Sequence, residues 1–322
     1  MKKVPTFDFT GKLRIPLIIS GCIFVVGFAL NFILGPELDI NFKGGVMLSY
    51  SYTGEVDPDA VLPVAEEIAG DDVKVTESSD FTGTKKNIVI NLSTEKTLST
   101  EKQKLMLAKL QEKFPDNDIK LSDSNSVSAT VGIRFFLKSL WTIALAGIFV
   151  TLYVGVRFRK IGGFSAGAMA LVALFHDIII AYLTFVILRI PIDDNFIAVV
   201  LTILGYSLND TIVIYDRIRE DRKKLGNRVP LGELVNGAIN KTLGRTLNTA
   251  LATFVAVTAV TVVAYLRGLD SILSFTMPMS IGIISGSYST IFLAGPLWVK
   301  WNEYRRRKKD EKKKKQRAEG KA

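Results

Sequence analysis

Long runs of apolar residues divide the sequence. Four windows carry no charged residue, and they cover residues 15–36, 139–156, 246–266 and 271–299. Each reaches the length of roughly 18 residues at which an apolar run becomes a candidate membrane-spanning helix. Two further apolar stretches of spanning length, residues 161–188 and 196–215, contain ionisable residues. The pattern predicts a polytopic α-helical membrane protein with six transmembrane helices and excludes a soluble protein.

A polar segment of about a hundred residues separates the first two predicted spans. Alternating or β-branched runs predict strands at residues 46–53, 73–76, 87–92 and 119–121. Helical spacing of apolar residues predicts one helix ending near residue 68 and another that Ser99 opens and Pro115 ends. The order β-α-β-β-α-β is typical of a ferredoxin-like fold. We therefore expect a small α+β domain between the first and second helices.

Together these patterns divide the chain. The predicted transmembrane helices are residues 15–36, 138–157, 161–188, 194–216, 244–267 and 270–300. The remaining predicted parts are an N-terminus at residues 1–14, the α+β domain at 37–137, a loop at 217–243 and a tail at 301–322.

Lys and Arg residues are unequally distributed among the loops. They are frequent in the N-terminus, at residues 157–160, in the 217–243 loop and in the tail, whereas the loops near residues 189–195 and 267–270 hold one each. Basic loops stay on the cytoplasmic side of a membrane. The sequence therefore predicts that both termini are cytoplasmic and that the α+β domain is extracytoplasmic.

Two polar segments and one span have further local patterns. Residues 230–242 predict a short amphipathic helix, which would lie at the membrane interface or, less simply, dock a partner. The basic tail is predicted to be disordered and to bind anionic membrane lipids rather than a specific nucleic acid.

In the last span, Pro278 predicts a kink or an irregular helix start. Gly282 and Gly286 form a GxxxG step that favours close helix packing.

Composition removes several classes of function. With one Cys and one His in 322 residues, neither an intrachain disulfide nor a Cys-based or His-rich metal site can be built. No P-loop, dinucleotide fingerprint or metalloprotease motif is present. We therefore expect no ATP-driven activity, no metal and no cofactor, so that any work must draw on an ion gradient or a partner.

Asp210 is the sharpest candidate for chemistry. A carboxylate within a span costs about 2.5–3.5 kcal/mol at the centre of the membrane, and such residues mark ion or proton pathways. Helical spacing places Ser207 and Thr211 on or beside its face, and Asn209 flanks it.

Arg245 is the expected partner of Asp210. It opens the fifth predicted span, and Asn248 and Thr249 continue its polar stripe. A permanently charged Arg beside an Asp that gains and loses a proton would form a proton relay. A static buried pair, or an Arg245 that reaches the headgroups without meeting Asp210, would fit the same pattern. His176 and Asp177 form a second polar island, which could pass protons or only join helices.

Several motifs carry a family resemblance: FHD at residues 175–177, GYSLNDTIV at 205–213, DRIRE at 216–220 and RTLNT at 245–249. With them the chain resembles the SecF-type subunits of the SecD/SecF family, within the resistance-nodulation-division superfamily. The resemblance covers essentially the whole chain and includes the motif glycine Gly205.

One motif departs from the family. After the first helix the family typically carries Asp-Phe-Thr-Gly-Gly, whereas this chain has Asn41-Phe42-Lys43-Gly44-Gly45. Gly44 and Gly45 are retained, but the role of the family's carboxylate is not assigned to Asn41.

The resemblance implies a role in the bacterial cytoplasmic membrane. It implies a proton-driven accessory subunit that is not an enzyme and that works with a SecD-like subunit, a SecYEG-type Sec channel and a translocating preprotein. Asp210 and Arg245 would be its relay residues. H+ is the expected coupling ion, and Na+ remains open. The alternatives are half of a small-molecule or lipid exporter of the same superfamily and a passive scaffold with a buried ion pair.

Overall fold

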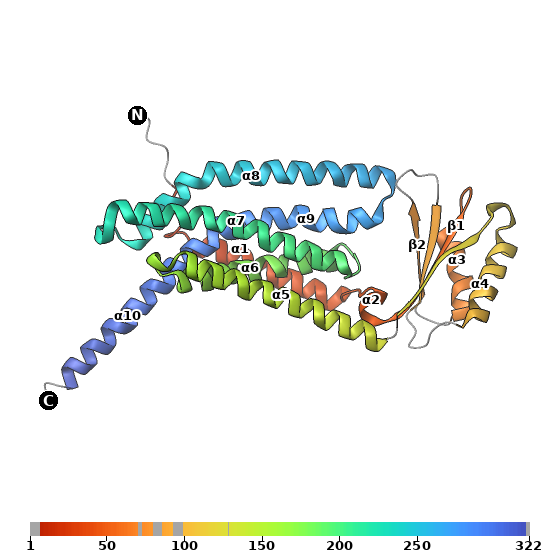
Figure 1. The fold of residues 1–322 in the computed structure, drawn as a ribbon, viewed down its shortest axis with the longest axis horizontal. Helices are drawn as coiled ribbons and strands as arrows, with labels where there is room; N and C mark the ends of the chain where they lie inside the picture. Colours follow the sequence, from red (N-terminus) through yellow and green to blue (C-terminus); the bar gives the residue numbers. More distant parts are fainter. Residues whose placement is uncertain (1–6, 70–72, 80–85, 93–98, 128, 320–322) are drawn as a thin grey trace.

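The computed structural model describes residues 7–69, 73–79, 86–92, 99–127 and 129–319, so the first six and last three residues of the predicted termini lie outside it. Figure 1 shows an elongated helical bundle with a small sheet domain at one end and helix α10 projecting from the other.

Within the described residues, six helices are long and apolar enough to cross a membrane. They are α1 (Arg14–Leu34), α5 (Ala129–Arg157), α6 (Gly163–Ile187), α7 (Asp194–Leu225), α8 (Leu231–Arg267) and α9 (Asp270–Ser289), and α9 continues through a π-helical turn (Thr290–Ala294) into α10 (Gly295–Glu319). The prediction of a mostly helical protein with six candidate membrane helices is confirmed.

Helices α6 and α9 form the centre of the bundle. In α6, 56% of the most apolar window is buried, against 11% in α1 and 6% in α8. Many buried positions of α6 are small, among them Ala166, Gly167, Ala170 and Ala173. Small side chains let helices approach closely, which gives packing contacts that lipid cannot replace. Helices α1 and α8 consequently lie at the outside of the bundle.

The described residues between α1 and α5 include a four-stranded antiparallel sheet. Its strands are β1 (Gly45–Tyr52), β2 (Val73–Ser79), β3 (Lys86–Leu92) and β4 (Lys120–Val127), in the order β2-β3-β1-β4. Alternate residues of β1 are buried in one core with apolar residues of α3 (Pro58–Ala69) and α4 (Thr100–Lys113). Ser99 caps α4, since its hydroxyl accepts a hydrogen bond from Lys102 N at 3.4 Å.

The predicted short helix at residues 230–242 is not a separate element. A single helix, α8, runs from Leu231 to Arg267 and includes both that segment and the following span. No proline follows Pro230 within it, and the glycines that remain weaken a helix by only about 1 kcal/mol each. Buried Leu234, Val235 and Ile239 pack this first part against the bundle.

Two further expectations about the C-terminal part, a disordered tail and an irregular helix start at Pro278, are wrong, whereas a kink at Pro278 stays a prediction. The tail is helical through Glu319 rather than disordered, because Lys, Arg, Gln and Glu are good helix formers that continue an existing helix. Pro278 lies inside α9, which begins at Asp270. The irregular segment is instead the π-helical turn Thr290–Ala294.

Gly44 and Gly45 connect the short helix α2 (Ile40–Lys43) to β1. Their φ angles are +85° and +147°, a region that side chains other than glycine rarely adopt. A Cβ at Gly45 would also lie 2.4 Å from the backbone oxygen of Leu92 on β3. Both glycines are therefore required where the chain enters the sheet.

Replacing Gly45 with Ala should weaken the β1–β3 pairing, because it adds backbone strain of about 1–3 kcal/mol and a clash with Leu92. Hydrogen exchange of the purified full chain should become roughly tenfold faster or more in β1 and β3. Gly21→Ala is the control, since a Cβ at Gly21 meets no atom within 4 Å. Equal exchange in the two variants would contradict the assigned role of Gly45.

Candidate functional site

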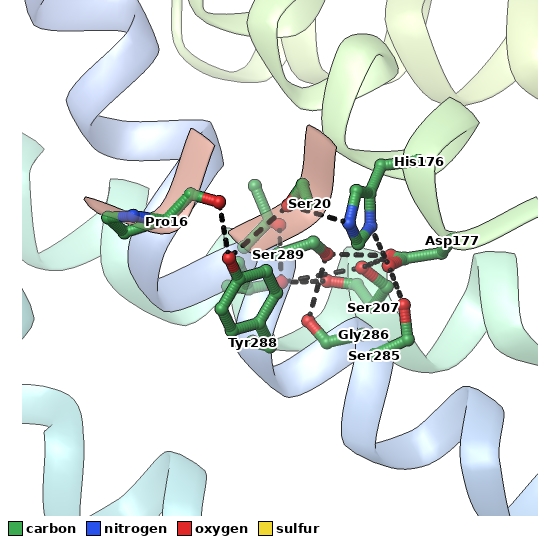
Figure 2. Close-up of polar contacts among 11 residues, drawn as sticks. Pro16, Ser20, His176, Asp177, Ser207, Ser285, Gly286, Tyr288 and Ser289 are labelled. Atoms are coloured by element: carbon green, nitrogen blue, oxygen red, sulfur yellow. Dashed lines mark hydrogen bonds and ion pairs between the residues drawn. The ribbon is translucent and has the colours of Figure 1, made fainter. Parts of the chain in front are cut away.

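A buried carboxylate lies where the central helices meet. Asp177 on α6 has no exposed surface. It accepts hydrogen bonds from Ser207 on α7 at 3.0 Å and from Ser285 and Ser289 on α9 at 2.6 and 2.7 Å, and His176 Nδ1 lies 3.2 Å from its Oδ1 (Figure 2). Each carboxylate oxygen thus has two polar partners, which is what a buried charge requires.

The same cluster reaches α1 through the imidazole. His176 Nε2 lies 3.1 Å from the hydroxyl of Ser20, and that hydroxyl lies 3.2 Å from the Tyr288 hydroxyl (Figure 2). Tyr288 donates to the carbonyl of Pro16 at 2.7 Å. A continuous polar chain therefore joins α6 and α9 to the first helix.

A chain of hydroxyls extends in the other direction. Thr290, in the π-helical turn, lies 3.3 Å from the hydroxyls of both Ser207 and Thr211. Ser207 in turn donates to Asp177. The chain ends at Thr211, which follows Asp210 in the sequence.

Close helix packing positions these groups. A Cβ at Gly282 would lie 2.1 Å from Ile203, and one at Gly286 would lie 3.3 Å from Cβ of Ser207. The absence of side chains at these two positions lets α7 approach α9. Ser285 and Ser289, one turn apart on α9, then reach Asp177 together with Ser207.

Asp210 has a different environment. Its side chain is only 2% exposed, yet its Oδ2 is buried with no hydrogen-bond partner. In the described part of the chain it makes no ion pair with Arg245. The expected direct contact between the two relay residues is not formed here.

Arg245 lies instead beside a cavity. This cavity of about 620 Å³ is also lined by Asn209 of α7 and by charged residues near the ends of the spans, including Arg157, Asp216 and Arg217. Asn248 is exposed and Thr249 half-buried, and among the described residues neither side chain hydrogen-bonds to Asp210. Gly205 is exposed on α7, with open space around it.

The two carboxylates therefore differ in what they can do. Asp177 is fully hydrogen-bonded and joins three helices, whereas Asp210 keeps an unpartnered oxygen that could take up a proton. Among the described residues, no group of three or more His, Cys, Asp or Glu residues could hold a metal ion.

Sequence reasoning placed His176 and Asp177 together but did not identify their partners. Ser285 and Ser289 follow the Gly282–Gly286 step by three residues each, and their spacing of four on an apolar helix was a usable signal. Ser20, Tyr288 and Thr290 were missed, because isolated hydroxyl residues in apolar helices form no pattern.

Comparison with known proteins gives a consistent result. Residues 106–304 match the family described as "Protein export membrane protein SecD/SecF, C-terminal". The chain is 32% identical to the protein translocase subunit SecF of Alicyclobacillus acidocaldarius over 92% of its own length and 93% of that protein. It is 30% identical to the protein translocase subunit SecDF of Bacillus subtilis, matching 92% of this chain and 38% of that protein.

Two solved structures have a similar fold. A crystal structure of SecDF from Thermus thermophilus, described as a translocon-associated membrane protein, has a TM-score of 0.75 at 26% identity. A second SecDF structure, in a Super-membrane-facing form, has a TM-score of 0.62 at 27% identity. The first match covers 93% of this chain and 39% of the SecDF chain, so this chain spans about two fifths of the SecDF length.

Replacing Asp177 with Ala should destabilise the bundle, because the imidazole and three hydroxyls would lose their common acceptor. Removing one partner from a buried charged network typically costs about 3–5 kcal/mol. The midpoint of thermal unfolding of the purified full chain should fall clearly. Asp216→Ala, which removes a half-exposed carboxylate paired with Arg157 and Arg219, should cost less than about 1 kcal/mol. Equal shifts for the two variants would argue against a joining role for Asp177.

Proposed function

The chain belongs to the SecD/SecF family of protein export membrane proteins, and we propose that it acts as a SecF-type accessory subunit that uses the proton motive force to promote late steps of polypeptide translocation. The relatives are named protein translocase subunits, which supports an accessory role in Sec export. Their names favour polypeptide translocation over export of small molecules or lipids, and a transport role without enzymatic activity.

Asp210 is the observation that carries the proton-coupling part of the proposal. A buried carboxylate with an unpartnered oxygen is costly, and protonation removes that cost. Asn209 and Arg245 line the neighbouring cavity, which supports access from that end of the spans. In the proposed cycle, Asp210 pairs with Arg245 in one state and is protonated in the other, with no cofactor and with H+ as the coupling ion.

The open helix faces support a requirement for a SecD-like partner. Asn209 and Gly205 on α7 are exposed, as are large apolar residues of α8 such as Leu247, Leu251 and Val255. SecDF relatives are more than twice as long as this chain. We propose that a SecD-like subunit covers these faces, and that the complex acts with a SecYEG-type channel on a translocating preprotein.

The proposed membrane orientation follows from the basic loops. The N-terminus, the loop between α7 and α8 and the tail are rich in Lys and Arg, so both termini are assigned to the cytoplasm. The sheet domain, proposed to be ferredoxin-like, then lies outside the membrane and could contact the emerging polypeptide.

Asp210→Asn tests this function. The variant cannot exchange a proton at this position. The assay measures polypeptide translocation into vesicles that contain this chain, a SecD-like partner and the Sec channel. An imposed proton gradient should increase translocation with the unmodified chain, and this increment should be lost in the variant. Membrane insertion should be unchanged. Asp194→Asn, at the exposed start of the same helix, should retain the stimulation by the proton gradient. A normal increment with Asp210→Asn would refute proton coupling through this residue, and an increment driven by a sodium gradient alone would exclude H+ as the coupling ion.

A further inference from the structure

Helix α1 is held to the bundle by few polar contacts. Two lie near its middle and its start, from Ser20 to His176 and from Tyr288 to the Pro16 carbonyl. Farther along, Tyr182 on α6 donates to Asn31 at 2.7 Å, and Arg189, just after α6, donates to the carbonyl of Leu34 at 2.7 Å. After its last turn the chain continues through α2 into β1. The contacts of α1 therefore bear on the position of the sheet domain.

The contacts from Pro16 to Asp177 form a chain of hydrogen bonds, and the hydrogen atoms that it requires can be counted from the chemistry of its groups. A carbonyl can only accept, so the Tyr288 proton lies in the 2.7 Å contact with Pro16. The Ser20 proton must then lie in the contact between Ser20 and Tyr288. The remaining contact of Ser20, with His176 Nε2 at 3.1 Å, needs a proton on Nε2.

The other ring nitrogen needs a proton as well. Nδ1 of His176 faces Oδ1 of Asp177 at 3.2 Å, and a carboxylate can only accept. Both oxygens of Asp177 already accept serine hydroxyls, which leaves no favourable position for a proton on the carboxyl group. The four contacts from Pro16 to Asp177 need four protons, whereas Tyr288, Ser20 and a neutral imidazole supply three.

We propose that His176 and Asp177 form a proton-binding site in which the imidazole holds a second, dissociable proton, and that this proton completes the hydrogen-bond chain tying α1 to the bundle. The site is distinct from Asp210, and it does not rest on the proposed export function, because it is measured without transport.

The surroundings of His176 and Asp177 suit a positively charged imidazole whose one counter-charge is the Asp177 carboxylate. From α9 the ring meets Tyr288, and from α1 it meets Phe24, with ring centroids 5.8 and 5.2 Å away. Cys22 of α1 lines the same groove of about 650 Å³, which is otherwise mainly apolar. Among the described residues of α7, the uncharged Ser207 is the one that hydrogen-bonds to Asp177. Among the described residues, Asp210 and Arg245 have no hydrogen bond or ion pair with His176 or Asp177.

Loss of the second proton would leave one of the four contacts without a hydrogen. Two oxygen or nitrogen lone pairs would then face each other, so that contact would open. The neutral ring keeps its proton on Nδ1, because the Asp177 carboxylate is a stronger acceptor than a hydroxyl group. The contact that opens is therefore one of the three between His176 and Pro16, and these three attach α1. The site thus gives proton binding a direct route to the helix that leads into β1.

Because His176 is the only histidine in the chain, nitrogen NMR of histidine-labelled full-length protein in lipid bilayers reports this site alone. At neutral pH we expect both ring nitrogens to carry a proton. Ser20→Ala and Tyr288→Phe should each leave a neutral ring protonated at Nδ1, because the acceptor for Nε2 is removed in the first and Ser20 becomes free to donate to Nε2 in the second. Asp177→Asn should also give a singly protonated ring.

Tyr182→Phe is the matched control. It removes a hydrogen bond between α6 and α1 that is not part of the hydrogen-bond chain from Pro16 to Asp177, and it should leave both ring nitrogens of His176 protonated. A singly protonated ring in the unmodified protein would overturn the proposal. A doubly protonated ring that persists in Ser20→Ala and in Tyr288→Phe would also overturn it, because the proton would then not depend on the chain to α1.

Discussion

The bundle depends on the complete hydrogen bonding of one buried charge. An unpaired carboxylate in this environment would cost several kcal/mol, and Asp177 avoids that cost only where α6, α7 and α9 meet in one relative position. Ser207, Ser285 and Ser289 supply hydroxyl donors there, and His176 supplies a ring nitrogen. Gly282 and Gly286 allow the required approach of α7 to α9. The polar cluster and the small-residue packing are therefore parts of one arrangement.

Asp210 differs from Asp177 in its hydrogen bonding and in its partners. It is buried, but one of its oxygens has no partner, and Arg245 lies beside a cavity rather than in an ion pair with it. A satisfied carboxylate fixes helices, whereas an unsatisfied one favours proton uptake or the arrival of a counter-charge. The exposed faces of α7 and α8 around it suit completion by a partner, in keeping with the longer SecDF relatives.

The sequence predicted what depends on spacing along one segment. Lengths of apolar runs predicted six candidate membrane helices, and Ser99 marked the start of α4. What depends on the rotation of one helix against another was not predictable, so the contact expected between Asp210 and Arg245 is absent in the described structure. The partners Ser20, Tyr288 and Thr290 carry no periodic signal. The charged tail was misjudged because like charge was weighed above the helix propensity of Lys, Arg and Glu.

The central claim is that the two buried carboxylates have separate roles, with Asp177 joining the helices and Asp210 exchanging a proton in the proposed cycle. Infrared difference spectroscopy of the full chain in lipid, titrated across neutral pH, tests this most directly, because a protonated carboxyl group has its own carbonyl band. The account predicts one such band from the membrane spans that disappears in Asp210→Asn and persists in Asp177→Asn. A band that disappears in Asp177→Asn and persists in Asp210→Asn would contradict it.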